Sequence, residues 1–295
     1  MKRREVLLGS VAGLATLGHV RVAAQSPEPA GYAHPDWFAD PAWLAEHIGR
    51  DDLSIVALTA TDDFAAGHIP GAAQIDWPAF EIVETDESSV ETWQGEVEAI
   101  LTDLGIERSN TVVVYDGGTF WAGRLWWILH FLGHEDVRVL NGGLQAWTAS
   151  GGELETEPSA VSAAGSLYQG TPNQDVIVTI DEAVAAFEAE EAIFVDARSA
   201  GEFAEGHIPG AVNIPFTDNA VDGEPRFWKT PEELLAHYAA AGITPDLRVI
   251  PYCTTGVRSA VTYFTLRQLG FENVSLFTGS FAEWSADPER PVERA

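Results

Sequence analysis

The single cysteine of the chain, Cys253, lies in the stretch YCTTGVRSA, where a glycine and an arginine follow it closely. An apolar run, RVIPY, precedes it, and SAVTYFTLRQLG follows with the spacing of a helix, so we expect the thiol at a strand-to-helix turn. The first N–H groups of a helix have no carbonyl partner, and a loop that curls around the sulfur would present them to an anion. Because Arg258 acts in the same direction, the pattern predicts a lowered thiol pKa and a nucleophilic thiolate.

Three patterns occur twice in the same order. FAAGHIPGAAQI begins at Phe64 and FAEGHIPGAVNI at Phe203, whereas NGGLQAW begins at Asn141 and TGSFAEW at Thr278. The third pair is the strand, turn and helix around Cys253 and its counterpart in the first half. The offsets are all about 137 to 139 residues, a domain-sized period that indicates two copies of one domain in tandem.

The two copies differ where chemistry is expected. The first copy has other residues at three positions: Asp116 for Cys253, Trp121 for Arg258 and Thr59 for Arg198. This predicts a catalytic second copy and a silent first copy. Ligands of open α/β sheets bind beyond the carboxyl ends of the strands, so we expect Arg198, at the end of VDAR, to bind substrate together with Arg258. The backbone of the loop should complete the site through Thr254, Thr255, Gly256, Val257 and Ser259.

The fold class is predicted from the alternation of unbroken apolar strands with helices, which is typical of a mainly parallel sheet covered by helices on both faces. We expect one such domain at 37–152 and the other at 176–293. Between them, 153–175 is rich in Ser, Gly, Pro and Ala and is interpreted as a linker. Residues that both copies share are expected to be structural: His68 and His207, Trp147 and Trp284.

Five residues of the silent copy receive structural expectations. Asp116 should cap the turn before Gly117 and Gly118. Arg124 is expected to be solvated or paired. The aromatic residues of this region are expected at the domain interface: Trp121, Trp126 and Trp127.

The net charge of −29 excludes some partners and leaves little basic surface. Lysine occurs only as Lys2 and Lys229, so nucleic acid and anionic membranes would be repelled. The acidic bias indicates adaptation to high salt, or simply an acidic protein. One cysteine cannot form an intrachain disulfide, and no Cys/His cluster has metal-ligand spacing, so we predict no metal site. No cofactor motif is present, and we predict no cofactor.

The N-terminus, residues 1–25, has the features of an export signal. Lys2, Arg3 and Arg4 precede a short stretch of small apolar residues that closes with VAAQ. The Arg3–Arg4 pair is similar to a twin-arginine signal. The stretch is too short and too weakly apolar to predict a stable membrane span. We therefore expect export, with a cytoplasmic protein as the alternative.

Together these motifs resemble the two-domain rhodaneses, over the whole chain after the signal. The resemblance rests on Cys-x-x-Gly-x-Arg after an apolar strand, on VDAR, on GHIPGAVN and on the late Gly-x-x-x-x-Trp element. It implies a monomer that transfers sulfane sulfur from thiosulfate to a small acceptor, cyanide or a thiol, through a Cys253 persulfide. It also implies that Arg198 and Arg258 hold the oxyanion.

Three alternatives remain at this stage. Cysteine phosphatases of similar architecture use Cys-x5-Arg, whereas here the arginine comes one residue earlier and favours a single sulfur over a tetrahedral oxyanion. The 3-mercaptopyruvate sulfurtransferases resemble the loop in Gly256 and Val257 but have a small hydroxyl residue in place of Arg258. The loop also lacks the basic residue that many thiosulfate enzymes carry after the cysteine. A sulfur carrier or anion-binding protein without turnover is the third alternative.

Overall fold

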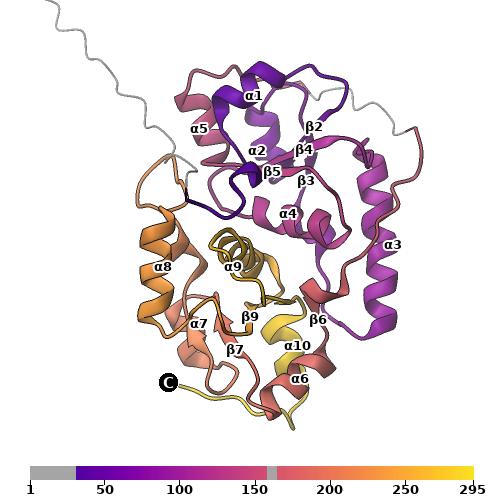
Figure 1. The fold of residues 1–295 in the computed structure, drawn as a ribbon. Helices are drawn as coiled ribbons and strands as arrows, with labels where there is room; N and C mark the ends of the chain where they lie inside the picture. Colours follow the sequence, from indigo (N-terminus) through magenta and orange to yellow (C-terminus); the bar gives the residue numbers. More distant parts are fainter. Residues whose placement is uncertain (1–30, 158–164) are drawn as a thin grey trace, which may run out of the picture.

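The structure is a computed structural model that describes residues 31–157 and 165–295. The predicted signal, 1–25, lies outside the described residues, as does part of the predicted linker. Two α/β units follow one another along the chain (Figure 1). Each contains parallel strands connected through helices, which confirms the predicted fold class.

The first unit has a five-stranded sheet in the order β1-β5-β4-β2-β3, with every pair parallel. Its strands are β1 (Phe38–Ala39), β2 (Leu53–Leu58), β3 (Ala73–Ile75), β4 (Thr111–Tyr115) and β5 (Val137–Leu140). Its helices are α1 (Pro41–His47), α2 (Thr61–Ala66), α3 (Glu87–Asp103), α4 (Ala122–Phe131) and α5 (Gly143–Ala149). The central strands are buried along most of their length, as a sheet covered on both faces requires.

The second unit repeats this order with shorter strands. Its strands are β6 (Ile177–Val178), β7 (Ile193–Asp196), β8 (Val212–Asn213), β9 (Val249–Tyr252) and β10 (Leu276–Phe277). Its helices are α6 (Ile180–Glu188), α7 (Ala200–Glu205), α8 (Pro231–Ala240), α9 (Val257–Gln268) and α10 (Ser280–Ala286). The pairs β8-β7-β9 and β10-β6 are parallel, and a single parallel bridge between Val249 and Val274 joins them.

The two units meet through α4 and α9, the helices that follow the two equivalent central strands (Figure 1). A side chain on Gly123 of α4 would stand 3.3 Å from the Cα of Val261 on α9, so the two backbones approach closely. Nearby, the rings of Trp126 and Phe264 pack edge to face with centroids 4.7 Å apart. This contact brings the first turn of α9, and hence the loop that precedes it, next to the first unit.

Residues that the two copies share hold equivalent parts of the fold. Nδ1 of His68 donates to the carbonyl of Phe64, and Nδ1 of His207 to that of Phe203. Both imidazoles are buried and stack on those phenylalanine rings. The equivalent tryptophans, Trp147 and Trp284, are buried as well. These positions agree with the structural roles expected from the repeat.

The described parts of the predicted linker lie against the first unit. The amides of Gly165 and Gly170 donate to carboxylates of Glu107 and Glu98, respectively. The Tyr168 ring is buried and its hydroxyl bonds the His134 imidazole. Within the described chain, no helix is long and apolar enough to cross a bilayer.

Candidate active site

Cys253 directly follows β9 and lies in the turn that leads into α9. Its side chain is only 1 % exposed. Its backbone N–H donates to the hydroxyl of Ser280 (3.1 Å), and its carbonyl accepts from the amide of Phe281 (3.1 Å). Ser280 has a positive φ of 59°, which is uncommon for a residue with a side chain. The backbone of the thiol is therefore held by the turn between β10 and α10, a role for Ser280 that the sequence did not reveal.

The pKa of the Cys253 thiol is lowered although the sulfur is buried. Burial alone would raise the pKa, but the side chain and amide of Ser259, the charge of Arg258 and the amide of Thr255 outweigh it. The Ser259 hydroxyl is buried, and hydrogen bonding from this side chain is the largest of the effects that lower the thiol pKa. Polar groups thus surround the sulfur and favour the thiolate.

Arg258 lies on the first turn of α9 and binds a carboxylate that the sequence analysis did not include. Its guanidinium makes two bonds of 2.8 Å with Glu202 and a third, of 2.7 Å, with the Thr254 hydroxyl. This pairing lowers the pKa of Glu202 to about 2. Glu202 also closes the N-terminal capping box of α7 with Ser199. The Ser-x-x-Glu pattern was therefore visible in the sequence, but it signals a helix cap and not a partner for Arg258.

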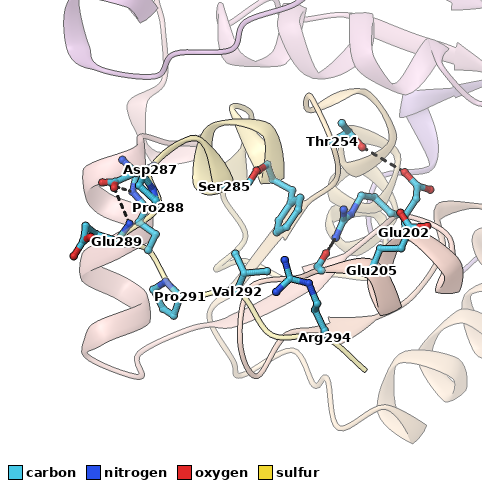
Figure 2. A pocket seen from close by; sticks show the side chains of 14 residues that line it. Glu202, Glu205, Thr254, Ser285, Asp287, Pro288, Glu289, Pro291, Val292 and Arg294 are labelled. Atoms are coloured by element: carbon cyan, nitrogen blue, oxygen red, sulfur yellow. Dashed lines mark hydrogen bonds and ion pairs between the residues drawn. The ribbon is translucent and has the colours of Figure 1, made fainter.

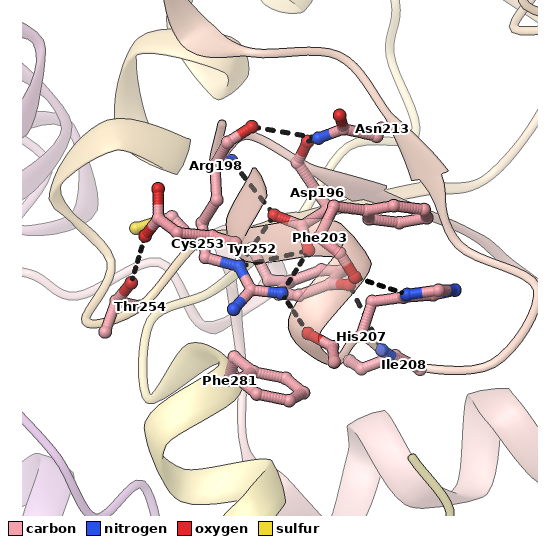
Figure 3. A network of polar contacts seen from close by, with 12 residues as sticks. Asp196, Arg198, Phe203, His207, Ile208, Asn213, Tyr252, Cys253, Thr254 and Phe281 are labelled. Carbon is pink, nitrogen blue, oxygen red and sulfur yellow. Dashed lines mark hydrogen bonds and ion pairs between the residues drawn. The ribbon is translucent and has the colours of Figure 1, made fainter. Parts of the chain in front are cut away.

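Arg198 follows β7 and is fixed by Asp196, the buried last residue of that strand (Figure 3). Its Nε and Nη2 donate to Asp196, and Nη2 also donates to the carbonyl of Gly206. Its guanidinium carbon lies 4.2 Å from the ring centroid of Phe281. Asp196 is fully buried, and the salt bridge measures 2.6 Å. Nη1 makes none of these bonds, so it is the part of the fork available to a ligand.

A cavity of about 820 Å³ opens beside the thiol loop (Figure 2). Arg198, Glu202 and Thr254 line one part of it, and the chain from Ser285 to Arg294 lines another. Cys253 itself does not line this cavity. Arg198 and Thr254 therefore line the same cavity. Thr254 directly follows Cys253 and bonds Arg258, which is paired with Glu202.

The silent copy has a carboxylate where the second copy has sulfur. Asp116 is buried, and its oxygens accept from the amides of Gly118 (2.6 Å), Thr119 (2.8 Å) and Ala122 (2.8 Å). Burial raises its pKa against these donors. The predicted cap is confirmed, and the same turn in both copies presents amides to an acidic side chain.

Of the tryptophans expected at the domain interface, Trp126 and Trp127 are buried in the hydrophobic cluster that includes residues of both units. Trp121 packs against that cluster and is partly exposed beside Trp77. The expectation for Arg124 was wrong: it is neither solvated nor ion-paired, since it is 0 % exposed and forms no salt bridge within residues 31–157 and 165–295. Trp121 immediately precedes α4, whereas Arg124 lies on its first turn and bonds Thr278 of the second unit. In that same described part of the chain, no group of three His, Cys, Asp or Glu could hold a metal.

Two parallel α/β units with one activated thiol at a strand-to-helix turn define a tandem thiol-nucleophile protein. Residues 40–150 and 179–287 each match the rhodanese-like domain. These matches cover most of the chain, and the chain belongs to the rhodanese-like family.

Curated relatives extend over nearly the same length. The chain is 31 % identical to the 3-mercaptopyruvate sulfurtransferase of Escherichia coli, over 87 % of this chain and 98 % of the relative. It is 33 % identical to a thiosulfate sulfurtransferase of Pseudomonas aeruginosa (86 % and 96 %) and 34 % identical to a sulfur carrier protein of Thermus thermophilus (86 % and 95 %).

Solved structures show the same arrangement of two units. The 3-mercaptopyruvate sulfurtransferase of Escherichia coli superposes with a TM-score of 0.73 at 30 % identity, covering 84 % of this chain and 99 % of that one. An anaerobic ergothioneine biosynthesis enzyme of Chlorobium limicola superposes with a TM-score of 0.78 at 28 % identity, covering 89 % of this chain and 71 % of that one.

Proposed function

We propose that this protein is a thiosulfate sulfurtransferase with Cys253 as its nucleophile. The observation that carries the proposal is a buried thiol whose pKa is held down by loop amides, a serine hydroxyl and an arginine. The Cys253 thiolate attacks the outer sulfur of thiosulfate, the S–S bond breaks, and its electron pair leaves with sulfite. A persulfide remains on Cys253. An acceptor such as cyanide or a thiolate then attacks the outer sulfur and releases the Cys253 thiolate.

The residues around the thiol have distinct roles in this scheme. The amides of the loop hold the sulfur anion before and after transfer. Arg258 attracts the donor and stabilises charge on the departing sulfite, which requires that the donor displace Glu202 from part of the guanidinium. Arg198 binds an oxyanion through Nη1 while Asp196 fixes its plane. Thiosulfate is a dianion, and the two arginines supply the charge that it needs.

3-Mercaptopyruvate is the second candidate donor, and one contact favours it. Glu202 already binds both terminal nitrogens of Arg258, so the site has less free positive charge than the loop sequence indicates. A monocarboxylate donor would need less positive charge from the site than dianionic thiosulfate. Relatives named for each of the two activities match this chain with similar identity and coverage, so the comparisons do not distinguish between the two donors.

Steady-state rates with each donor test the proposal. We expect kcat/KM for thiosulfate with cyanide as acceptor to exceed that for 3-mercaptopyruvate, and Cys253→Ser to abolish turnover with both while keeping the thermal unfolding midpoint. A clear preference for mercaptopyruvate would overturn the donor. If Cys253→Ser still delivers sulfur fully, the protein acts by binding alone. If the wild-type protein takes up one sulfur but does not turn over, it is a sulfur carrier.

We further propose a monomer that is exported through its twin-arginine-type N-terminus and that carries its acidic surface as an adaptation to high salt. The net charge of −29 and the segment 1–25 support this. N-terminal sequencing of the protein from its native cell tests export: a mature chain that begins near residue 26 agrees with it, and an intact N-terminus in the cytoplasmic fraction contradicts it. Sedimentation at several salt concentrations tests the monomer.

A further inference from the structure

Arg124 of α4 is a buried cation in the silent unit. Its side chain is 0 % exposed. Nη1 donates to the hydroxyl of Thr278 (2.9 Å) and Nη2 to the carbonyl of Phe80 (2.8 Å), while Nε has no partner within the described part of the chain. The guanidinium carbon lies 5.5 Å from the ring centroid of Trp93 and 5.0 Å from that of Trp127. The hydrogen-bond partners of its guanidinium among the described residues are neutral acceptors, and two aromatic rings lie against it.

A buried guanidinium without a carboxylate is costly, because desolvation is offset only by neutral dipoles. The other arginines near the site, Arg198 and Arg258, each bind a carboxylate at 2.8 Å or less. Burial lowers the pKa of Arg124 to about 10, and the charges that oppose this are those of Cys253 first and Glu81 second. Cys253 lies across the domain boundary, and the groups that lower its own pKa most are Ser259, Arg258 and Thr255.

The geometry connects Arg124 to the thiol loop on two sides. A side chain on Gly256, the residue immediately before α9, would stand 3.2 Å from Nη1 of Arg124, so the guanidinium lies against the loop. Thr278, which accepts from the same nitrogen, belongs to the turn whose Ser280 binds the Cys253 amide. Arg124 thus lies against both segments that hold Cys253, and it does not line the surface cavity.

We propose that Arg124 is a positioning residue through which the silent unit supplies the counter-charge for the Cys253 thiolate and persulfide. Its positive charge stabilises the anionic sulfur across the interface, and its bond to Thr278 fixes the turn beneath it. This proposal rests on the nucleophilic role of Cys253 proposed above. In this proposal the unit that contains Cys253 depends on a charge supplied by the unit without a cysteine.

The thiol also faces other charges, and these set the background of any titration. On α9, Arg258 faces the sulfur and is paired with Glu202 of α7. Arg198, in the bend after β7, is paired with Asp196 at the end of that strand. On α10, the buried carboxyl of Glu283 bonds the amide and hydroxyl of Thr85, and burial raises its pKa. A substitution at Arg124 leaves the ion pairs and hydrogen bonds of these groups in place. It does remove the positive charge that interacts with Glu81.

The test is the pH dependence of Cys253 alkylation by iodoacetamide in the full-length protein, which needs no sulfur donor. We expect Arg124→Met to raise the thiol pKa by about one unit, and so to slow alkylation below that pKa about tenfold. Arg124→Lys keeps the charge and should retain most of the lowered pKa. The matched control is Arg138→Met, which removes an arginine from the same unit that also stacks on a tryptophan, Trp43, but belongs to β5.

An unchanged alkylation profile in a folded Arg124→Met protein overturns the proposal. Should the methionine variant fail to fold, Arg124→Gln, which keeps an amide donor for Thr278 and Phe80, gives the same comparison. A lysine variant whose thiol pKa rises as much as that of the neutral variants contradicts a role for charge. Because alkylation reports the thiolate alone, a normal profile with no sulfur transfer would instead count against the proposed function.

Discussion

At the scale of single residues, Cys253 and Asp116 show what one turn can do with two different acids. In each copy the chain leaves a central strand, and backbone amides point at the side chain that follows. A carboxylate in that position is a permanent cap, whereas a thiolate can leave the ring of amides as a nucleophile. Nucleophilic attack at this turn therefore requires both the ring of backbone amides and the sulfur atom.

Glu202 is predicted to compete with the donor for Arg258. Because its pKa is lowered to about 2, it stays ionised throughout the pH range of the assay. Removing its charge in Glu202→Gln should lower KM for thiosulfate by about threefold, the scale of partly exposed ion pairs, and less at high salt. The measurement is steady-state kinetics at constant acceptor.

The matched control for this change is Glu182→Gln. Glu182 holds the same third position in the capping box of α6, with Thr179 in place of Ser199. It should leave KM unchanged. A KM for thiosulfate that is unchanged or raised in the Glu202 variant would show that the carboxylate does not oppose donor binding.

At the scale of elements, the strand, the turn and the helix place the sulfur only if the turn is closed by a residue in the left-handed region. Gly256 has φ of +83°, and a side chain there would stand 2.6 Å from Oγ1 and 2.7 Å from the carbonyl oxygen of Thr278. Gly242, after α8, has nearly the same φ of +80° but open space around it. Substituting alanine at both glycines therefore distinguishes the cost of backbone strain, which both share, from the cost of steric crowding, which only Gly256 has.

We predict that Gly256→Ala destabilises the protein by more than Gly242→Ala, whose cost should be only the left-handed strain of about 1–2 kcal/mol. Gly256→Ala should also lower kcat/KM about tenfold or more, because small displacements of a nucleophile are costly. Denaturant unfolding and steady-state kinetics check both variants. Equal effects of the two substitutions on both measurements would contradict the account of the turn.

Much of the fold and part of the site could be predicted from the sequence. The strand before Cys253 and the helix after it follow from local apolar patterning, and the repeat identified the silent turn and its Asp116 cap. Asp196 is two positions before Arg198 in VDAR, a spacing that puts two side chains on one face while the chain is extended. In the structure β7 ends at Asp196, and Arg198 bonds it from the bend that follows.

Other features could not be read from local patterns. Arg124 and Thr278 are far apart in the chain and meet only because α4 packs against α9. On its own helix, Arg124 is one polar residue among apolar ones, and its burial depends on the other unit. Glu202 likewise meets Arg258 across two elements. These contacts are set by tertiary packing, which periodicity within one segment does not encode.

At the scale of the whole molecule, charge and duplication act together. The acidic surface repels itself, and the formal charge of −29 leaves few basic partners to relieve it. Three arginines lie near the thiol loop: Arg258 and Arg198 are paired with Glu202 and Asp196, and Arg124, from the first unit, bonds Thr278. In the proposed function the two paired arginines receive the anionic donor.

We predict that stability rises with salt. Added potassium chloride screens the repulsion between carboxylates, since the Debye length falls from about 10 Å at 0.1 M to about 3 Å at 1 M. The midpoint of thermal unfolding should therefore increase over this range. A non-ionic osmolyte at matched osmolarity is the control, and a midpoint that stays flat or falls with salt would contradict electrostatic self-repulsion.

The central claim is that Cys253 carries the transferred sulfur as a persulfide within its ring of amides. Intact-mass spectrometry of the purified protein after brief incubation with thiosulfate tests it most directly. The account predicts a gain of one sulfur atom that maps to the Cys253 peptide, disappears on addition of cyanide and is absent from Cys253→Ser. No gain from thiosulfate in a folded protein with an alkylatable thiol, or an equal gain in the serine variant, would contradict it.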